Sequence, residues 1–75
     1  MGKLRTLSGR ELCGILTANG FEFVRHGKGD HDIYSRQEGD VTYTASVPMH
    51  REVAVGTLAS LVRRSGLPRS LFEVQ

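Results

Sequence analysis

Gly27-Lys28-Gly29-Asp30-His31-Asp32-Ile33-Tyr34 joins two runs of strand-forming residues and holds a lysine and a histidine close together. The two glycines tolerate backbone conformations that a Cβ forbids, so this stretch predicts a turn that a phosphate group can approach closely. Histidine changes its charge near neutral pH, so His31 is a candidate proton carrier. A plain hairpin turn, followed by a histidine at a sheet edge, accounts for the same residues.

Three strands are predicted around this turn, over residues 21–26, 30–37 and 41–47. Strict alternation places Phe21, Phe23 and Arg25 on one face of the first strand and Glu22, Val24 and His26 on the other. The third strand alternates between an apolar face and a hydroxyl face formed by Thr42, Thr44 and Ser46. We group Tyr34 and Arg36 with this hydroxyl face, as a solvated surface or a surface for a protein partner. Pro48 ends the strand because it cannot donate a ladder hydrogen bond.

Helices are predicted on either side of these strands. Ser8-Gly9-Arg10-Glu11 is a capping box for a helix over residues 8–19, and Asn19-Gly20 ends it. Residues 58–65 have helical spacing, and Arg63 and Arg64 complement the negative end of the helix dipole. The predicted fold is therefore a two-layer α+β domain of order α-β-β-β-α. A three-stranded antiparallel sheet carries both helices on one face.

Composition limits the class of protein. The 75 residues suffice for one domain, residues 1–75, and the net charge is +2. No apolar run approaches the roughly 20 residues that a membrane helix needs, so no membrane contact is expected. Cys13 is the only cysteine, which favours a reducing, cytoplasmic location.

The acidic and histidine residues do not indicate a metal site. Asp30 and Asp32 lie on either side of His31, and neighbours on a strand point to opposite faces. His26 and His50 add no ligand pair with helical spacing. Ser8 is used as a cap and Cys13 falls inside the first helix, so neither indicates an activated nucleophile. We expect no metal and no cofactor.

A ribonuclease site is the better match, because RNA supplies its own nucleophile, the 2′-hydroxyl. His31 would carry the proton, Lys28 and Gly29 would hold the phosphate, and Arg25 would add a second cation. Asp30 and Asp32 would favour a protonated His31 but would also repel RNA.

Several segments together resemble the HicA (YcfA-like) mRNA interferase toxins over roughly residues 7–73. These are Ser8-Gly9-Arg10-Glu11, Asn19-Gly20-Phe21, Gly29-Asp30-His31, Val47-Pro48-Met49-His50, Gly56-Thr57-Leu58 and Arg63-Arg64-Ser65-Gly66-Leu67. The resemblance implies a fold like double-stranded-RNA-binding domains and metal-independent cleavage of mRNA by His31. It also implies neutralisation by a HicB-like antitoxin, and a structural or substrate-contacting role for His50.

Two positions depart from the pattern of that family. Asp30 stands where a serine is usual, and Asp32 stands where many members have a second histidine. The alternative is therefore a non-catalytic RNA- or protein-binding module on the same fold.

Overall fold

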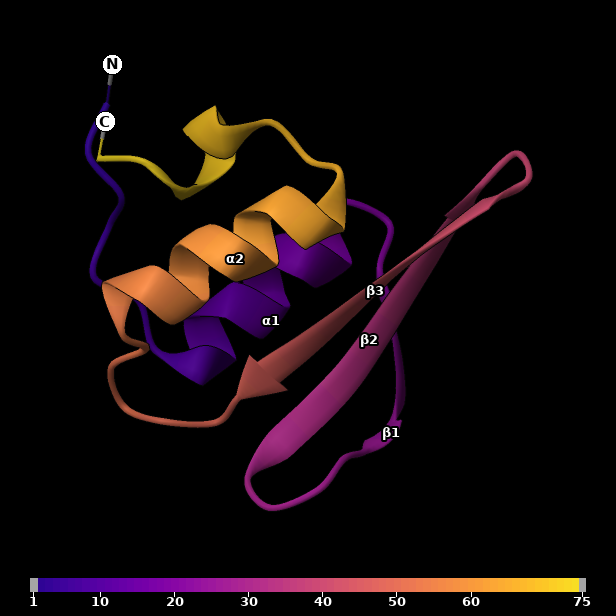
Figure 1. Cartoon of the computed structure of the whole chain (residues 1–75), viewed down its shortest axis with the longest axis horizontal. Helices are drawn as coiled ribbons and strands as arrows, with labels where there is room; N and C mark the ends of the chain where they lie inside the picture. The colour runs from indigo at the N-terminus through magenta and orange to yellow at the C-terminus, as the bar shows by residue number, and fades with distance from the viewer. Residues whose placement is uncertain (1, 75) are drawn as a thin grey trace.

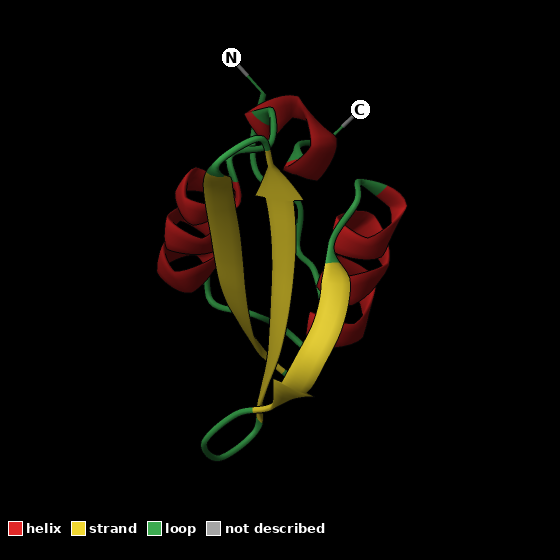
Figure 2. Ribbon diagram, turned by 90° about the vertical axis from the view of Figure 1, so that its right-hand side faces the viewer, coloured by secondary structure: helices red, strands yellow, loops and turns green. Residues whose placement is uncertain are grey.

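The computed structural model of the chain describes residues 2–74. Its elements are α1 (Gly9–Ala18), β1 (Glu22–His26), β2 (His31–Glu38), β3 (Val41–Pro48), α2 (Val55–Ser65) and a short 3-10 helix, η1 (Arg69–Phe72). Both helices lie on one side of the three-stranded sheet (Figure 1), and Figure 2 shows the strands in front of them. The predicted order and the two-layer α+β arrangement are confirmed.

The capping box at the start of α1 is present. The hydroxyl of Ser8 accepts a hydrogen bond from the Glu11 amide at 3.0 Å, and the Glu11 carboxylate accepts one from the Ser8 amide at 2.9 Å. Leu7 before the cap and Leu12 in the first turns are both buried. These residues fix both the start of the helix and the angle at which the chain enters it.

The sheet is antiparallel with strand order β1-β2-β3. The β2–β3 ladder is regular from His31 opposite Pro48 to Glu38 opposite Val41. Ala45 and Val47 of β3 are buried beneath the helices, while Thr42, Thr44 and Ser46 are exposed on the other, open face. The predicted alternation of β3 and its end at Pro48 are confirmed.

A β-bulge in β1 corrects the predicted faces of that strand. Phe23 pairs with Tyr34 and Arg25 pairs with Ile33, so Val24 has no partner of its own. A bulge inserts one extra residue and reverses the alternation beyond it. Arg25 consequently shares a face with Glu22 rather than with Phe23, and it lies on the open face of the sheet. Phe21, which the sequence placed in the strand, precedes it and is buried in the core.

The placement of Tyr34 and Arg36 on the hydroxyl face was wrong. Tyr34 lies opposite Ala45 and Arg36 lies opposite Tyr43, so both face the helices. The Arg36 guanidinium lies 4.4 Å from the ring centroid of Tyr43 and 5.4 Å from that of Phe21. Only 12% of its side chain is exposed, and it donates to the backbone carbonyl of Ser65 at 2.9 Å.

One apolar core joins the two layers, and the two ends of the chain close it. Phe72 of η1 is fully buried in this core. Leu4 forms an isolated antiparallel bridge with Glu73, and the Val74 amide donates to the Lys3 carbonyl at 2.7 Å. Both termini therefore lie side by side, at the end of the molecule opposite the β1–β2 turn (Figures 1 and 2).

Candidate active site

His31 is the first residue of β2, and the turn before it fixes its position. The Gly27 amide donates to the His31 carbonyl at 2.6 Å, which closes the hairpin. Gly29 has a φ of 67°, a conformation that residues with a Cβ rarely adopt. His31 is half-buried and lies on the open face with Ile33. The proton carrier predicted from sequence is thus accessible and held by a closed turn.

A shallow depression on the open face brings His31 together with two predicted cations. It is lined by Arg25, Gly27, Lys28, His31, Ile33 and Ser46. Gly29 does not line it and serves the turn instead. The bulge in β1 is the reason that Arg25 reaches this depression, because regular pairing would direct its side chain toward the helices.

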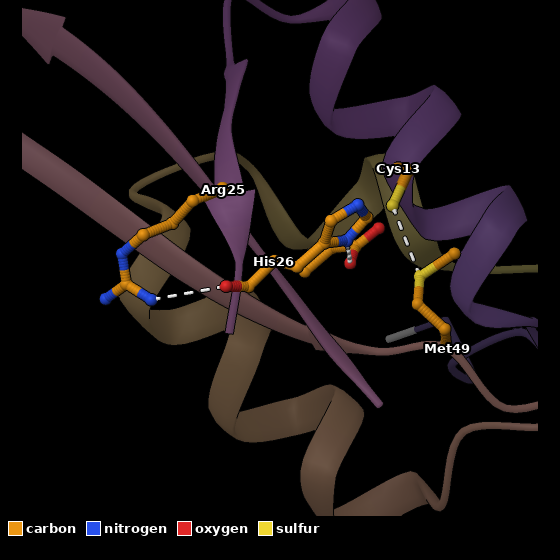
Figure 3. A network of polar contacts seen from close by, with 5 residues as sticks. Cys13, Arg25, His26 and Met49 are labelled. Atoms are coloured by element: carbon orange, nitrogen blue, oxygen red, sulfur yellow. Dashed lines mark hydrogen bonds and ion pairs between the residues drawn. The ribbon is translucent and has the colours of Figure 1, made fainter. Parts of the chain in front are cut away.

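The two aspartates beside His31 in the sequence lie elsewhere. The Asp32 carboxylate accepts a hydrogen bond from His26 at 2.7 Å on the helix-facing side. Arg25 and His26 point in opposite directions from β1 (Figure 3). An Asp30 oxygen lies 4.0 Å from the His50 ring. No aspartate or glutamate lines the depression, so the expected repulsion of RNA does not arise from its walls.

His31 also borders a second depression, between β3 and α2, that the sequence analysis missed. Its lining is His31, Ala45, Ser46, Gly56, Thr57, Ser60, Leu61 and Arg64. Thr57, Ser60 and Arg64 recur at spacings of three and four, so they form one stripe beside the buried face of α2. That spacing is readable in the sequence, but only the packing of α2 beside β3 brings the stripe into the same depression as His31.

His50 lines neither of the two depressions that His31 borders. It lines a third depression with Ser8, Arg10, Met49 and Arg51, and this lining shares no residue with the other two. Its backbone carbonyl accepts a hydrogen bond from the Gly9 amide at 2.9 Å. That bond secures the first turn of α1, which is a structural contribution of the backbone at this position.

The cysteine and the tyrosine nearest the site are not set up as nucleophiles. Cys13 is buried and its thiol lies 3.8 Å from the sulfur of Met49 (Figure 3). Burial raises the pKa of the Cys13 thiol, so the thiolate is disfavoured. Hydrogen bonding to Cys13 and burial raise the pKa of Tyr34 to about 12, so its phenol stays protonated at neutral pH. His31 is left as the candidate proton carrier of the open face.

Within residues 2–74, no group of three or more histidine, cysteine, aspartate or glutamate side chains is placed to hold a metal ion. Over the same residues, no helix is both long and apolar enough to cross a membrane.

The structure therefore defines a small α+β domain that holds a histidine among arginine and lysine side chains on an open sheet face. The family model of the HicA toxin of bacterial toxin-antitoxin systems matches residues 9–67, which is more than half of the chain. The chain belongs to the HicA toxin family. Comparison with curated proteins and comparison with solved structures each gave no match. The similarity of its fold to double-stranded-RNA-binding domains therefore stays a prediction.

Proposed function

We propose that this HicA family member is an RNA endonuclease that cleaves mRNA without a metal ion, with His31 as the general acid or base. The observation that carries the proposal is the depression on the open face, which His31 shares with Arg25 and Lys28. The two cations supply the charge that a phosphodiester requires, and the histidine supplies a group that moves protons near neutral pH.

The chemistry that these residues support is an internal transfer within RNA. The ribose 2′-oxygen attacks the adjacent phosphorus as its proton leaves, and the bond from phosphorus to the 5′-oxygen breaks as that oxygen takes up a proton. His31 accepts the first proton or donates the second, and solvent water makes the other transfer. Arg25 and Lys28 stabilise the negative charge that develops on the phosphoryl oxygens. The products are a 2′,3′-cyclic phosphate and a free 5′-hydroxyl.

Family membership implies an antitoxin partner, and we propose that this partner is HicB-like. A domain that acts on mRNA works where mRNA is translated, so we propose the cytoplasm as its location.

The decisive experiment compares wild type with His31→Ala for growth arrest on expression and for cleavage of a defined RNA in vitro. We expect the substitution to reduce the cleavage rate by about 10²–10⁴, the contribution of one general acid or base. Cleavage by wild type should persist in EDTA. It should stop when a 2′-deoxynucleotide replaces the residue on the 5′ side of the cut.

Each control separates one part of the proposal. Equal cleavage by both proteins would reject His31 as the proton carrier, and loss of cleavage in EDTA would reject the metal-independent route. His26→Ala is the matched histidine control, because His26 is exposed and lies on the helix-facing side of the sheet, away from the depression. An inert wild type that still binds RNA would indicate the non-catalytic module.

A further inference from the structure

We propose that the depression between β3 and α2 is a second nucleotide subsite. It would hold the ribose and phosphate of a nucleotide beside the cleaved bond, with Arg64 as the phosphate contact. The proposal deepens the proposed function and rests on it. His31 borders this depression as well as the one lined by Arg25 and Lys28. An RNA strand with its reactive phosphate at His31 therefore extends into both.

The hydroxyl groups of this depression are free to bind a ligand, since they make no hydrogen bond to the described residues. Ser46, Thr57 and Ser60 line it, and within residues 2–74 none of their side chains makes a hydrogen bond. By contrast, the hydroxyls of Ser8, Thr17 and Ser65 each bond to the backbone. Hydroxyls that converge on an open depression and lack internal partners suit the 2′-hydroxyl and the oxygens of a sugar–phosphate chain.

The charged side chain that lines the depression is positive. Arg64 is exposed and lines it, no carboxylate does, and within the described chain Arg64 has no ion-pair partner. Arg63, the preceding residue in the same helical turn, is also exposed but lies outside the lining. Ala45 and Leu61 add an apolar floor. The depression thus combines a cation, three hydroxyls and an apolar base, which is the composition expected for a nucleotide contact.

The two neighbouring arginines provide a matched experiment. Arg64→Ala and Arg63→Ala remove the same charge from the same helix end, so they change net charge and dipole interaction alike. Binding of a single-stranded RNA oligonucleotide is measured by fluorescence anisotropy against salt concentration, in a His31→Ala background in which cleavage is slow. Loss of one phosphate contact should lower the magnitude of the slope of log Kobs against log salt by about 0.7. If that contact contributes little at 1 M salt, affinity falls about fivefold at 0.1 M salt for Arg64→Ala.

Arg63→Ala should leave the slope and the affinity close to those of the parent protein. Equal effects of the two substitutions, or no effect of either, would overturn the subsite. Because the assay measures binding, its result stands even if the wild-type chain fails to cleave RNA. Failure of the cleavage proposal and failure of the subsite are therefore distinguishable.

A second pair of variants tests whether RNA occupies the depression between β3 and α2. A Cβ at Gly56 or at Gly14 would meet no atom within 4 Å, but only Gly56 lines the depression. Gly56→Leu should fill the depression and weaken RNA binding several-fold, whereas Gly14→Leu on α1 should not. Thermal unfolding of both variants checks that they fold. Unchanged RNA binding by a folded Gly56→Leu protein would exclude a nucleotide from this depression.

Discussion

Arg36 is the residue that joins the sheet to the end of α2. Its guanidinium lies against Tyr43 and Phe21, donates to Ser65 of α2, and bonds to Glu38 at 3.0 Å. Its buried Nε has no hydrogen-bond partner within residues 2–74, which offsets part of this gain. Because α2 carries Arg64, the packing of Arg36 also sets the position of the second depression.

We predict that Arg36→Ala lowers the free energy of unfolding by about 2–4 kcal/mol. The substitution removes a hydrogen bond from a charged donor, worth about 1.5–3 kcal/mol, and a cation–π contact of about 0.5–2 kcal/mol. The free energy of unfolding of Arg36→Lys should lie between those of wild type and Arg36→Ala. A lysine keeps the positive charge but lacks the planar guanidinium that donates several hydrogen bonds. Urea unfolding followed by circular dichroism measures the change.

Arg25→Ala is the matched control for stability, because Arg25 is exposed on the open face. Its free energy of unfolding should stay within about 0.5 kcal/mol of wild type. If Arg36→Ala were as mild as Arg25→Ala, the contacts of Arg36 would contribute nothing net to stability.

The structure groups three of the candidate site residues, and their role in RNA cleavage stays a prediction. His31, Lys28 and Arg25 were recognised from residue type and from the glycine turn, and the structure places all three around one depression. Tyr34 and Arg36 were assigned to the wrong face. The two residues Gly39 and Asp40 between Glu38 and Val41 fix the register of the hairpin, and this register sets Arg36 opposite Tyr43. Glu38-Gly39-Asp40 predicts this turn from sequence, but the faces of Tyr34 and Arg36 follow only from the pairing across it.

At the scale of elements, α1 depends on its capping box, which makes its stability sensitive to acid. Hydrogen bonds from the backbone and side chain of Ser8 lower the pKa of the Glu11 carboxyl, with a smaller contribution from burial in the opposite direction. A carboxyl whose pKa is lowered by folding stabilises the protein above its unfolded value, and this stabilisation is lost as the pH falls through the folded value.

We therefore expect wild type to lose stability more steeply than Glu11→Gln as the pH falls below the ordinary glutamate value of 4.5. Above that value the difference in free energy of unfolding between the two proteins should be constant. Chemical unfolding at a series of pH values measures it. Glu22→Gln is a suitable control, since Glu22 is exposed and makes no side-chain hydrogen bond within residues 2–74. If Glu11→Gln and Glu22→Gln changed the pH dependence of the free energy of unfolding equally, the capping box would have no specific role in the acid sensitivity.

Elements differed in how well the sequence predicted them, for physical reasons. The start of α1 and the left-handed Gly66 after α2 follow from local chemistry, and a Cβ at Gly66 would collide with the ring of Tyr43. The bulge at Val24 has no such signature, because Val24 suits a regular strand equally well. It arises from pairing with β2, and only the paired structure reveals it.

At the scale of the whole molecule, the adjacent termini predict tolerance of circular permutation. A short glycine–serine linker would join the ends near the Leu4–Glu73 bridge, and new ends would open between Gly39 and Asp40. Gly39 is exposed and a Cβ there would meet no neighbour within 4 Å. We expect this permutant to keep the fold, judged by circular dichroism and thermal unfolding, and to keep the RNA affinity of the parent.

A permutant opened between Lys28 and Gly29 is the matched comparison, because it also opens an exposed hairpin turn. It should fold but bind RNA more weakly, since the cut frees Lys28 from its place beside His31. Equal RNA affinity of the two permutants would argue against the glycine turn as part of the binding surface.

The burial of Phe72 in the core has a consequence for synthesis on the ribosome. The core lacks this aromatic ring, and the strand bridge beside it, until residues 72–74 have left the exit tunnel. A chain that stops before Phe72 would contain every residue that lines the two depressions around His31. The hydrophobic core beneath those residues would still be incomplete. Copies terminated before Phe72 should therefore unfold at a lower temperature than copies that include residues 72–74, as thermal unfolding of the two would measure.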